Sequence, residues 1–234
     1  MIRRYRPSDR AAVAEVCVRT AAGGGDARGL YSDDLLMPEV FALPYVDHSP
    51  DLAFVVVRPD DGLDAASTTD PADPADPADA VLRVEDGRLT GYVIGVADTR
   101  EFASWWGRSW GPAFAARHPE PGASPTGREP GFPEAALLDA GRDGDRMVRG
   151  LTADELDAYP AHLHIDLLPE SQGQGLGRAL LDTLRSALAA RGVPGVHLGM
   201  DPANTRARAF YDRYGFHELP SHSPDGPLLG IATA

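Results

Sequence analysis

The sequence contains no lysine, so all 22 of its Lys and Arg residues are arginines. Its single cysteine, Cys17, excludes a disulfide within the chain and a thiolate metal site. No run of residues approaches the roughly 20 apolar positions that a membrane-spanning helix needs. The opening MIRRYRPSDR also lacks the apolar segment of a signal peptide. We therefore expect a soluble, cytoplasmic protein with no metal and no membrane partner.

The chain is acidic, with a formal net charge of -13 at pH 7. Nucleic acids and anionic membranes are held by clustered Lys and Arg side chains, so we expect no nucleic-acid partner. Basic small molecules are easier partners for such a surface. The exclusive use of arginine carries less weight, because a GC-rich genome produces the same bias together with abundant Ala, Gly, Pro and Asp.

The 234 residues can bury one hydrophobic core, and we expect a single domain over 1–234. The first residues predict a strand followed by a helix, and the apolar run LAFVVVR from Leu52 predicts another strand. The repeat TTDPADPADPADA at 68–80 has too many prolines for a helix, so we expect a solvated, disordered-type insertion. Beyond it, Asp86-Gly87 between two apolar runs is typical of a β-hairpin.

The apolar pattern loosens between residues 99 and 160, which predicts an excursion from the regular fold. From Ala161 onward, apolar strand segments alternate with amphipathic helices. This half of the chain therefore has a predicted β-α-β-α-β order.

Three glycines stand on alternate positions directly before a predicted helix, in the segment QGQGLG at 172–177. A strand, a glycine-rich turn and a helix N-terminus together form an anion site, because unpaired N–H groups converge and no Cβ blocks a phosphate. From the spacing alone, a tight turn that binds nothing is an equally good interpretation.

Two other phosphate-binding loops fit this segment poorly. A Walker loop requires a lysine, which the chain lacks. The dinucleotide fingerprint G-x-G-x-x-G fails in both registers, because Arg178 or Leu180 would occupy its third glycine. A Rossmann-type enzyme stays a minor alternative, since Asp201 mimics the ribose-binding acid of that motif.

Two motifs resemble those of the GNAT N-acetyltransferase superfamily. The loop from Gln172 to Gly177 matches the family pattern Q/R-x-x-G-x-G/A, and the segment from Asn204 to Phe216 matches N-x-x-A-x-x-x-Y-x-x-x-G-F at all five positions. The resemblance covers Ala161 to about Leu219. It implies an α/β (α+β) GNAT fold, with a mixed, mostly antiparallel sheet of about six to seven strands flanked by helices. That sheet would be splayed between the strands at 162–168 and 196–200.

A finer resemblance within this superfamily rests on the segments YVIGVADTREFASWW, YPAHLHIDLLPE and FYDRYGF. These segments are similar to the acetyltransferase-like C-terminal domain of animal O-GlcNAcases. The present chain has the glycine loop that those animal domains lack, so doubts about their activity do not apply to it.

The GNAT resemblance implies acetyl-CoA as the co-substrate, bound without a metal. Its pantetheine arm would pair with the backbone of Ile165, Asp166 and Leu167, and its pyrophosphate would accept hydrogen bonds from the amides of Gly173 to Arg178. The implied binding residues are Ile165, Asp166, Leu167, Gln172, Gly173, Gln174, Gly175, Leu176, Gly177, Arg178, Asn204 and Tyr211. Arg206, Arg208 and Arg213 are candidates for the 3′-phosphate, although charge balance on an acidic protein also explains them.

Tyr211 matches the family position of the general acid, which would protonate the departing CoA thiolate. Asn204 lies seven residues earlier on the same helical face, where it would contact the pantetheine. Each residue also has a structural interpretation: Tyr211 packs the last helix against the sheet, and Asn204 caps the N-terminus of that helix.

The attacking amine must lose a proton, which requires a base. Strand alternation places His162, His164 and Asp166 on one polar face, while the residues between them face the other way. We predict that His164 or Asp166 takes the proton, directly or through water, with His162 further out. For any one of the three, a purely structural role is the competing interpretation, and Asp166 stands where the family usually has a small or apolar residue.

The excursion at 99–160 is predicted to line the acceptor side of the site. Trp105, Trp106, Trp110 and Tyr159 would form an aromatic wall for a cationic or sugar-like acceptor, and His162 is a further predicted acceptor-binding residue. Such a cluster is more often a satellite core under a long loop, and that interpretation suits at least two of the three tryptophans better.

We predict an acetyl-CoA-dependent N-acetyltransferase of the EC 2.3.1 class, in which a primary amine of a small-molecule or peptide acceptor attacks the thioester in a ternary complex. The alternative is an acyl-CoA-binding sensor or interaction domain without turnover, which would need the glycines and Asn204 but no titrating group beside His162. Protein lysine, an N-terminal amine, a polyamine, an amino sugar and an antibiotic all stay open as acceptors, as does the oligomeric state.

Overall fold

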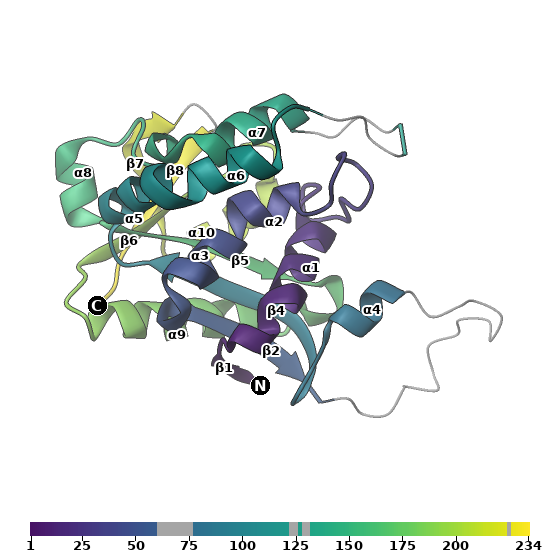
Figure 1. Cartoon of the computed structure of the whole chain (residues 1–234). Coiled ribbons are helices and arrows are strands. Elements are labelled where there is room, and N and C mark those ends of the chain that lie inside the picture. The colour runs from purple at the N-terminus through teal and green to yellow at the C-terminus, as the bar shows by residue number, and fades with distance from the viewer. Residues whose placement is uncertain (60–76, 122–125, 128–131, 224–225) are drawn as a thin grey trace.

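A β-sheet runs through the centre of the computed structural model, with helices on both of its faces (Figure 1). The structure describes residues 1–59, 77–121, 126–127, 132–223 and 226–234. Within these ranges the strands follow the order β1-β2-β4-β5-β6-β8-β7, and β3 pairs with β4. The strands are β1 (Ile2–Arg4), β2 (Ala53–Arg58), β3 (Arg83–Val84), β4 (Gly87–Val96), β5 (Ala161–Leu167), β6 (Gly195–Gly199), β7 (His217–Ser223) and β8 (Gly226–Ala232).

All neighbouring strands of this sheet are antiparallel except β5 and β6. The predicted mixed, mostly antiparallel sheet is therefore confirmed. It has eight strands in the described part of the chain, where six to seven were predicted, and β3 is only two residues long. Strands β3 and β4 form the predicted hairpin around Asp86, with Val84 opposite Gly87. This strand order differs from that of the doubly wound parallel sheet of a Rossmann enzyme.

Strands β5 and β6 separate soon after they meet. Their parallel pairing comprises only Ala161 opposite Val196 and His162 opposite His197. Each strand continues on its other side, because β5 stays paired with β4 as far as Leu167 and β6 stays paired with β8 as far as Gly199. The splay predicted between these two strands is thus confirmed, and it opens from His162 toward the carboxyl ends of both strands.

Two hydrophobic clusters fill the space between the sheet and its two helical layers. On one face, α1, α2 and α3 pack with residues of α5, α6 and α7; on the other face, the buried leucines of α9 pack with Tyr214 of α10. The helices are α1 (Arg10–Thr20), α2 (Leu36–Phe41), α3 (Leu43–His48), α4 (Pro77–Val81), α5 (Thr99–Trp105), α6 (Gly111–Arg117), α7 (Glu134–Arg142), α8 (Ala153–Ala158), α9 (Leu176–Ala189) and α10 (Thr205–Tyr214). Shorter helical turns are η1 (Pro7–Asp9), η2 (Pro50–Leu52), η3 (Trp106–Trp110), η4 (Gly144–Met147) and η5 (Pro169–Ser171).

The Asp-Pro-Ala repeat at 68–80 lies mostly outside the described residues, which omit 60–76. Its end differs from the prediction of a non-helical loop, because α4 begins at Pro77. Proline is tolerated in the first turn of a helix, where its missing N–H would have had no partner in any case. The single domain over 1–234 stays a prediction.

The excursion at 99–160 is mostly helical. Helix α5, the single π-turn η3 and α6 follow one another from Thr99 to Arg117, and α7, η4 and α8 come after them. This segment contributes Phe102, Trp106 and Phe114 to the buried cluster on the α1 side of the sheet. The excursion therefore forms much of the helical layer on that face.

Candidate active site

The glycine loop between β5 and α9 has two kinds of glycine. Gly173 and Gly175 adopt left-handed backbone angles, with φ of 73° and 77°, and a Cβ at either position would meet no atom within 4 Å. A Cβ at Gly177 would instead lie 3.1 Å from Cζ of Phe210 in α10. Gly173 and Gly175 therefore give the loop its conformation and an open surface, whereas Gly177 allows α9 and α10 to pack closely.

Most backbone N–H groups of this loop donate to no backbone acceptor in the part of the chain that the structure describes. Among the described residues, no backbone acceptor pairs with the N–H groups from Gly173 to Arg178, which include the first turn of α9. These are the amides that we expect to hold the pyrophosphate, whereas the N–H of Gln172, the first residue of the motif, donates to the carbonyl of Pro169 at 3.1 Å. Consecutive free amides at the N-terminus of a 14-residue helix form a site for an anion such as a diphosphate.

Two glutamine side chains brace the loop. Nε2 of Gln172 donates to the carbonyl of Leu167 at 2.8 Å, and Nε2 of Gln174 donates to the carbonyl of Glu170 at 2.6 Å. The first contact ties the turn to the end of β5, and the second ties it to η5. The side chains of these two predicted cofactor-binding residues therefore hold the loop in place, and only the main chain of Gln174 is left for a ligand.

The register of β4 and β5 decides which backbone groups of β5 face the splay. The N–H of Leu168 donates to the carbonyl of Thr90 at 2.9 Å, so this is a hydrogen-bonded pair. Such pairs alternate along an antiparallel ladder. The main chain of Asp166 is therefore engaged with Tyr92, its partner in register, while Ile165 and Leu167 direct their N–H and C=O groups toward β6. The predicted pantetheine-binding set is wrong for the backbone of Asp166.

Helix α10 carries the second motif. Oδ1 of Asn204 accepts a hydrogen bond from the N–H of Ala207 at 3.0 Å, so the capping interpretation of Asn204 is confirmed. Tyr211 is half-buried beside Phe210 and Phe216. Burial raises the pKa of the Tyr211 phenol, and the negative charge of Asp166 raises it further. Tyr211 packs against the same hydrophobic cluster as Ile165 and Leu167 of β5.

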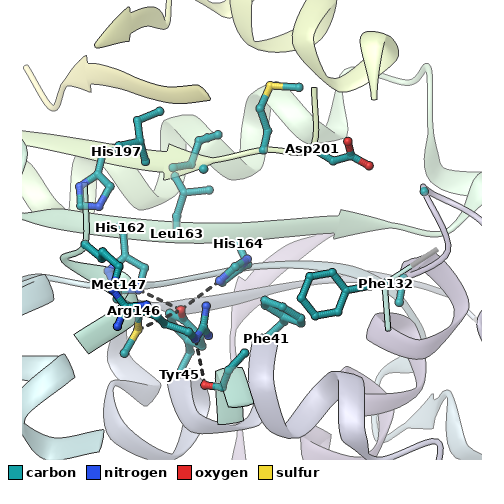
Figure 2. A pocket seen from close by; sticks show the side chains of 18 of the residues that line it. Phe41, Tyr45, Phe132, Arg146, Met147, His162, Leu163, His164, His197 and Asp201 are labelled. Atoms are coloured by element: carbon teal, nitrogen blue, oxygen red, sulfur yellow. Dashed lines mark hydrogen bonds between the residues drawn. The ribbon is translucent and has the colours of Figure 1, made fainter. Parts of the chain in front are cut away.

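A cavity of about 840 Å³ opens where β5 and β6 separate (Figure 2). Its walls combine residues from both strands with residues from the helical layer on the α1 side. They include Tyr31, Phe41, Tyr45, Phe132, Arg146, Met147, Arg149, His162, Leu163, His164, His197, Leu198, Gly199, Met200 and Asp201. The cavity thus connects the splay, where an acyl donor would enter, with the side on which an acceptor would bind.

A tyrosine between two histidines forms the floor of the cavity. The hydroxyl of Tyr45 lies 2.9 Å from Nε2 of His162 and 3.0 Å from Nε2 of His164. Figure 2 shows both imidazoles pointing at this hydroxyl, with the second ring nitrogen of His164 directed away from it. Two of the three residues predicted on the polar face of β5 therefore do face the cavity.

Both imidazoles are neutral at physiological pH. Burial lowers the pKa of His162 well below its ordinary value, and the imidazoles of His197 and His164 lower it further. Burial also lowers the pKa of His164 to about 3, with a further contribution from the positive charge of Arg146. A neutral imidazole has one N–H and one nitrogen lone pair, so each ring can accept a proton.

Asp166, the other predicted base, lies elsewhere. Oδ2 of Asp166 accepts a hydrogen bond from the Tyr92 hydroxyl at 2.5 Å, and burial raises the pKa of the carboxyl despite that bond. Asp166 is not among the residues that line the cavity. The structural interpretation of Asp166 fits this placement, and the carboxyl acts on Tyr211 only through its charge.

The predicted aromatic wall does not line the cavity. Trp106 is fully buried and donates from Nε1 to the carbonyl of Gly141 at 2.8 Å. Trp105 stacks on Phe102, and Nε1 of Trp110 donates to the carbonyl of Glu39 at 2.9 Å. Trp106 therefore belongs to the buried core of the helical layer, and Trp105 and Trp110 pack against that core.

Tyr159 also lies outside the cavity lining. Its ring packs against Gly195 and Gly230, and its hydroxyl lies 3.0 Å from Nε2 of His217. It therefore supports the pairing of β6 with β8. Of the predicted acceptor-binding residues, only His162 lines the cavity.

Sequence patterns missed the cavity residues contributed by the helical layer. Phe41 and Tyr45 come from α2 and α3, and Arg146 and Met147 come from η4. Phe132 precedes α7. These residues lie far apart in the sequence and follow no motif, and buried aromatic residues in short helices are as typical of a core as of a binding site.

The candidate phosphate-binding arginines of α10 divide into two groups. Arg208 forms ion pairs with Asp212 and Glu218, whereas Arg206 and Arg213 have exposed side chains. In the described ranges, no set of three or more His, Cys, Asp or Glu side chains is arranged to hold a metal ion. The described helices also include none that is both long enough and apolar enough to cross a membrane.

Comparisons with known proteins agree with this geometry. The model of the acetyltransferase (GNAT) family matches residues 101–216. The mycothiol acetyltransferase of Beutenbergia cavernae is 35% identical over 122 residues, which are 49% of this chain and 41% of that protein. The chain therefore spans less than half the length of this curated relative.

Two solved structures share the fold over nearly the whole chain. The crystal structure of SsHAT is 42% identical, with a TM-score of 0.75, and the alignment covers 100% of this chain and 98% of that one. The PaiA N-acetyltransferase of Thermoplasma acidophilum, solved in complex with coenzyme A, is 12% identical with a TM-score of 0.51 and shows the same fold alone.

Proposed function

Because the chain belongs to the GNAT acetyltransferase family, we propose that it transfers an acetyl group from acetyl-CoA to a primary amine of a small-molecule or peptide acceptor. The observation that carries this proposal is the separation of β5 from β6 after His162, which leaves two open strand edges at a cavity of about 840 Å³. A binding module would need the cofactor loop alone. Here a cavity with proton-accepting groups lies on the other side of the same splay.

The chain offers groups that fit acetyl-CoA. The free amides from Gly173 to Arg178 would hold its diphosphate, because the two left-handed glycines leave the approach to the main chain open. The outward N–H and C=O groups of Ile165 and the outward N–H of Leu167 would pair with the amides of its pantetheine arm. When bound, acetyl-CoA supplies an acetyl group that is activated as a thioester.

Two proton transfers accompany the reaction. A bond forms between the acceptor nitrogen and the acetyl carbon, and the bond from that carbon to the CoA sulphur breaks. His164 would take the proton that the acceptor nitrogen loses, because it lines the cavity and one of its ring nitrogens has a lone pair. Tyr211 would provide the proton that the departing sulphur gains, since a tyrosine phenol is protonated at neutral pH. An outward N–H of β5 would stabilise the negative charge on the carbonyl oxygen.

The acceptor would enter through the part of the cavity that the helical layer forms. Phe41, Tyr31 and Phe132 supply apolar surface there, and Arg146 and Arg149 supply positive charge. Asp201 is the acidic residue on the β6 side of this lining.

We further propose that the chain is related to the acetyltransferase-like C-terminal domain of animal O-GlcNAcases. Of the three segments that support this relation, the first joins β4 to α5, the second contains the whole of β5, and the third contains the end of α10. Two of these segments contain cavity or proton-transfer residues, His164 and Tyr211. The relation would therefore concern the site as well as the scaffold.

A thermal-shift panel followed by a turnover assay tests the proposal. Acetyl-CoA and CoA should raise the melting temperature in a concentration-dependent way, whereas NAD and ATP should not. An amine library should then release CoA from acetyl-CoA with equal acetylation of the amine. Stabilisation by NAD instead of CoA would remove the proposed co-substrate. Tight binding of acetyl-CoA without acetylation of any amine would favour the sensor alternative.

A further inference from the structure

A continuous chain of hydrogen bonds leads from a backbone carbonyl to the cavity. The hydroxyl of Thr99 lies 2.7 Å from the carbonyl oxygen of Pro160 and 2.9 Å from Nδ1 of His162. The hydroxyl of Tyr45 then joins Nε2 of His162 to Nε2 of His164. Thr99 is fully buried and His162 and Tyr45 are buried, so protein atoms, not solvent, decide which groups donate along this chain.

The direction of the first two bonds follows from counting protons. A carbonyl oxygen can only accept, so the single proton of the Thr99 hydroxyl points to Pro160. The Thr99 oxygen must therefore accept from His162, which places the ring proton of His162 on Nδ1. Since burial keeps this imidazole neutral, its Nε2 carries a lone pair and no proton.

The same proton count fixes the direction of the two hydrogen bonds of the Tyr45 hydroxyl. Its single hydroxyl proton points to the bare Nε2 of His162, which is a much better acceptor than Sδ of Met147 at 3.9 Å. The Tyr45 oxygen then accepts from His164, which places the ring proton of His164 on Nε2. The remaining nitrogen of His164, Nδ1, has a lone pair and no hydrogen-bond partner among the described residues.

That lone pair faces the cavity. His164 lines the cavity, and Figure 2 shows its second nitrogen directed away from Tyr45. Its Nδ1 atom is not sealed from solvent, because it is not among the buried side-chain atoms that lack a partner. An acceptor amine in the cavity can therefore reach it.

We propose that Thr99, His162 and Tyr45 are positioning residues that fix His164 as its Nε2–H tautomer, so that the Nδ1 lone pair of His164 accepts the proton of the acceptor amine. This inference rests on the proposed function. The proton moves from the acceptor nitrogen to Nδ1 of His164 while the carbon–nitrogen bond forms. The resulting imidazolium keeps its Nε2–H bond to Tyr45, so no other group in the chain has to turn. The proton afterwards returns to water through the cavity.

Nitrogen NMR of the full chain tests the tautomers directly. Long-range ¹H–¹⁵N correlations distinguish an Nδ1–H from an Nε2–H imidazole, and the loss of signals in His162→Gln and His164→Gln assigns two of the seven histidines. We expect His162 as the Nδ1–H form and His164 as the Nε2–H form. An Nδ1–H form of His164 in the unaltered protein would overturn the proposal, whatever the activity.

Thr99→Val tests the positioning role at a distance from the cavity. This variant has nearly the same shape, and the N–H of Thr99, which also donates to Pro160, is kept. Without the hydroxyl, nothing fixes the direction of the chain, so the Nδ1–H form of His164 should become populated. We expect kcat to fall in proportion to the Nε2–H population of His164 that is lost, by about twofold if the two forms become equally populated, with the KM for acetyl-CoA unchanged.

Thr99→Ser is the matched control, because it keeps the hydroxyl. It should retain both wild-type tautomers and restore kcat. A loss of kcat in Thr99→Val with the tautomer of His164 unchanged would show a merely structural role and overturn the proposal. Absence of acetylation in the unaltered protein, despite the expected tautomers, would count against the proposed function and not against the hydrogen-bond direction.

Discussion

Because the fold keeps His164 neutral, we expect the protein to lose stability in mild acid. The pKa of His164 is about 3 in the folded protein, against an ordinary value of 6.5. The unfolded chain therefore binds a proton at this residue between these two values, and the folded protein does not. Where the unfolded state binds more protons than the folded state, the free energy of unfolding falls as the pH is lowered. His164 therefore lowers the stability of the fold progressively as the pH falls below 6.5.

The magnitude follows from those two pKa values. Between pH 7 and pH 5, protonation of an unfolded histidine of pKa 6.5 favours unfolding by about 2 kcal/mol, because a folded group of pKa 3 stays neutral over that range. Urea titrations at several pH values measure this as a change in the free energy of unfolding. In His164→Gln, the loss between pH 7 and pH 5 should be smaller than in the wild type by about 2 kcal/mol.

Leu163→Ala is the control for this experiment. Leu163 is the buried neighbour of His164 in β5 and does not titrate. Its truncation should lower the free energy of unfolding by about 2–5 kcal/mol at every pH, so its curve runs parallel to that of the wild type. If His164→Gln also runs parallel to the wild type, His164 is not held neutral by the fold, and the reasoning on the cavity fails.

Three further outcomes follow from the site. Gly175→Ala should weaken acetyl-CoA binding and lower the free energy of unfolding by about 1 kcal/mol, because the left-handed backbone of Gly175 disfavours any Cβ. An unchanged affinity in a calorimetric titration would contradict a role of the loop in binding. Tyr211→Phe should lower kcat in the CoA-release assay while acetyl-CoA affinity stays nearly intact, and an unaltered kcat would remove Tyr211 as the acid. Asn204→Ala should lower the free energy of unfolding by about 1 kcal/mol through the lost cap, and a fully retained stability in urea titration would show that Oδ1 of Asn204 contributes little.

The part of the site that local backbone rules govern was predictable from the sequence. Left-handed turns demand glycine, and Gly173 and Gly175 meet that demand. The resemblance of two motifs placed β5, α9 and α10 in order, and the splay after His162 followed from it. Alternation along β5 correctly put His162 and His164 on one face, because strand geometry fixes that alternation whatever surrounds it.

The acceptor side was not predictable, because long-range packing decides it. Nothing local distinguishes Trp106, which is buried in the core, from an aromatic residue that lines a cavity. Tyr45 is separated from His162 by 117 positions, so its hydrogen bond has no signature in any sequence window. The role of Asp166 likewise depends on Tyr92, which reaches it across the sheet from β4.

A crystal structure of the protein with acetyl-CoA tests the central claim most directly. We expect the diphosphate to lie within hydrogen-bond distance of the amides from Gly173 to Arg178. The pantetheine arm should lie between β5 and β6, with its thioester at the mouth of the cavity. Ligand density at another place, with the loop amides paired to protein atoms and the two strands closed together, would contradict it.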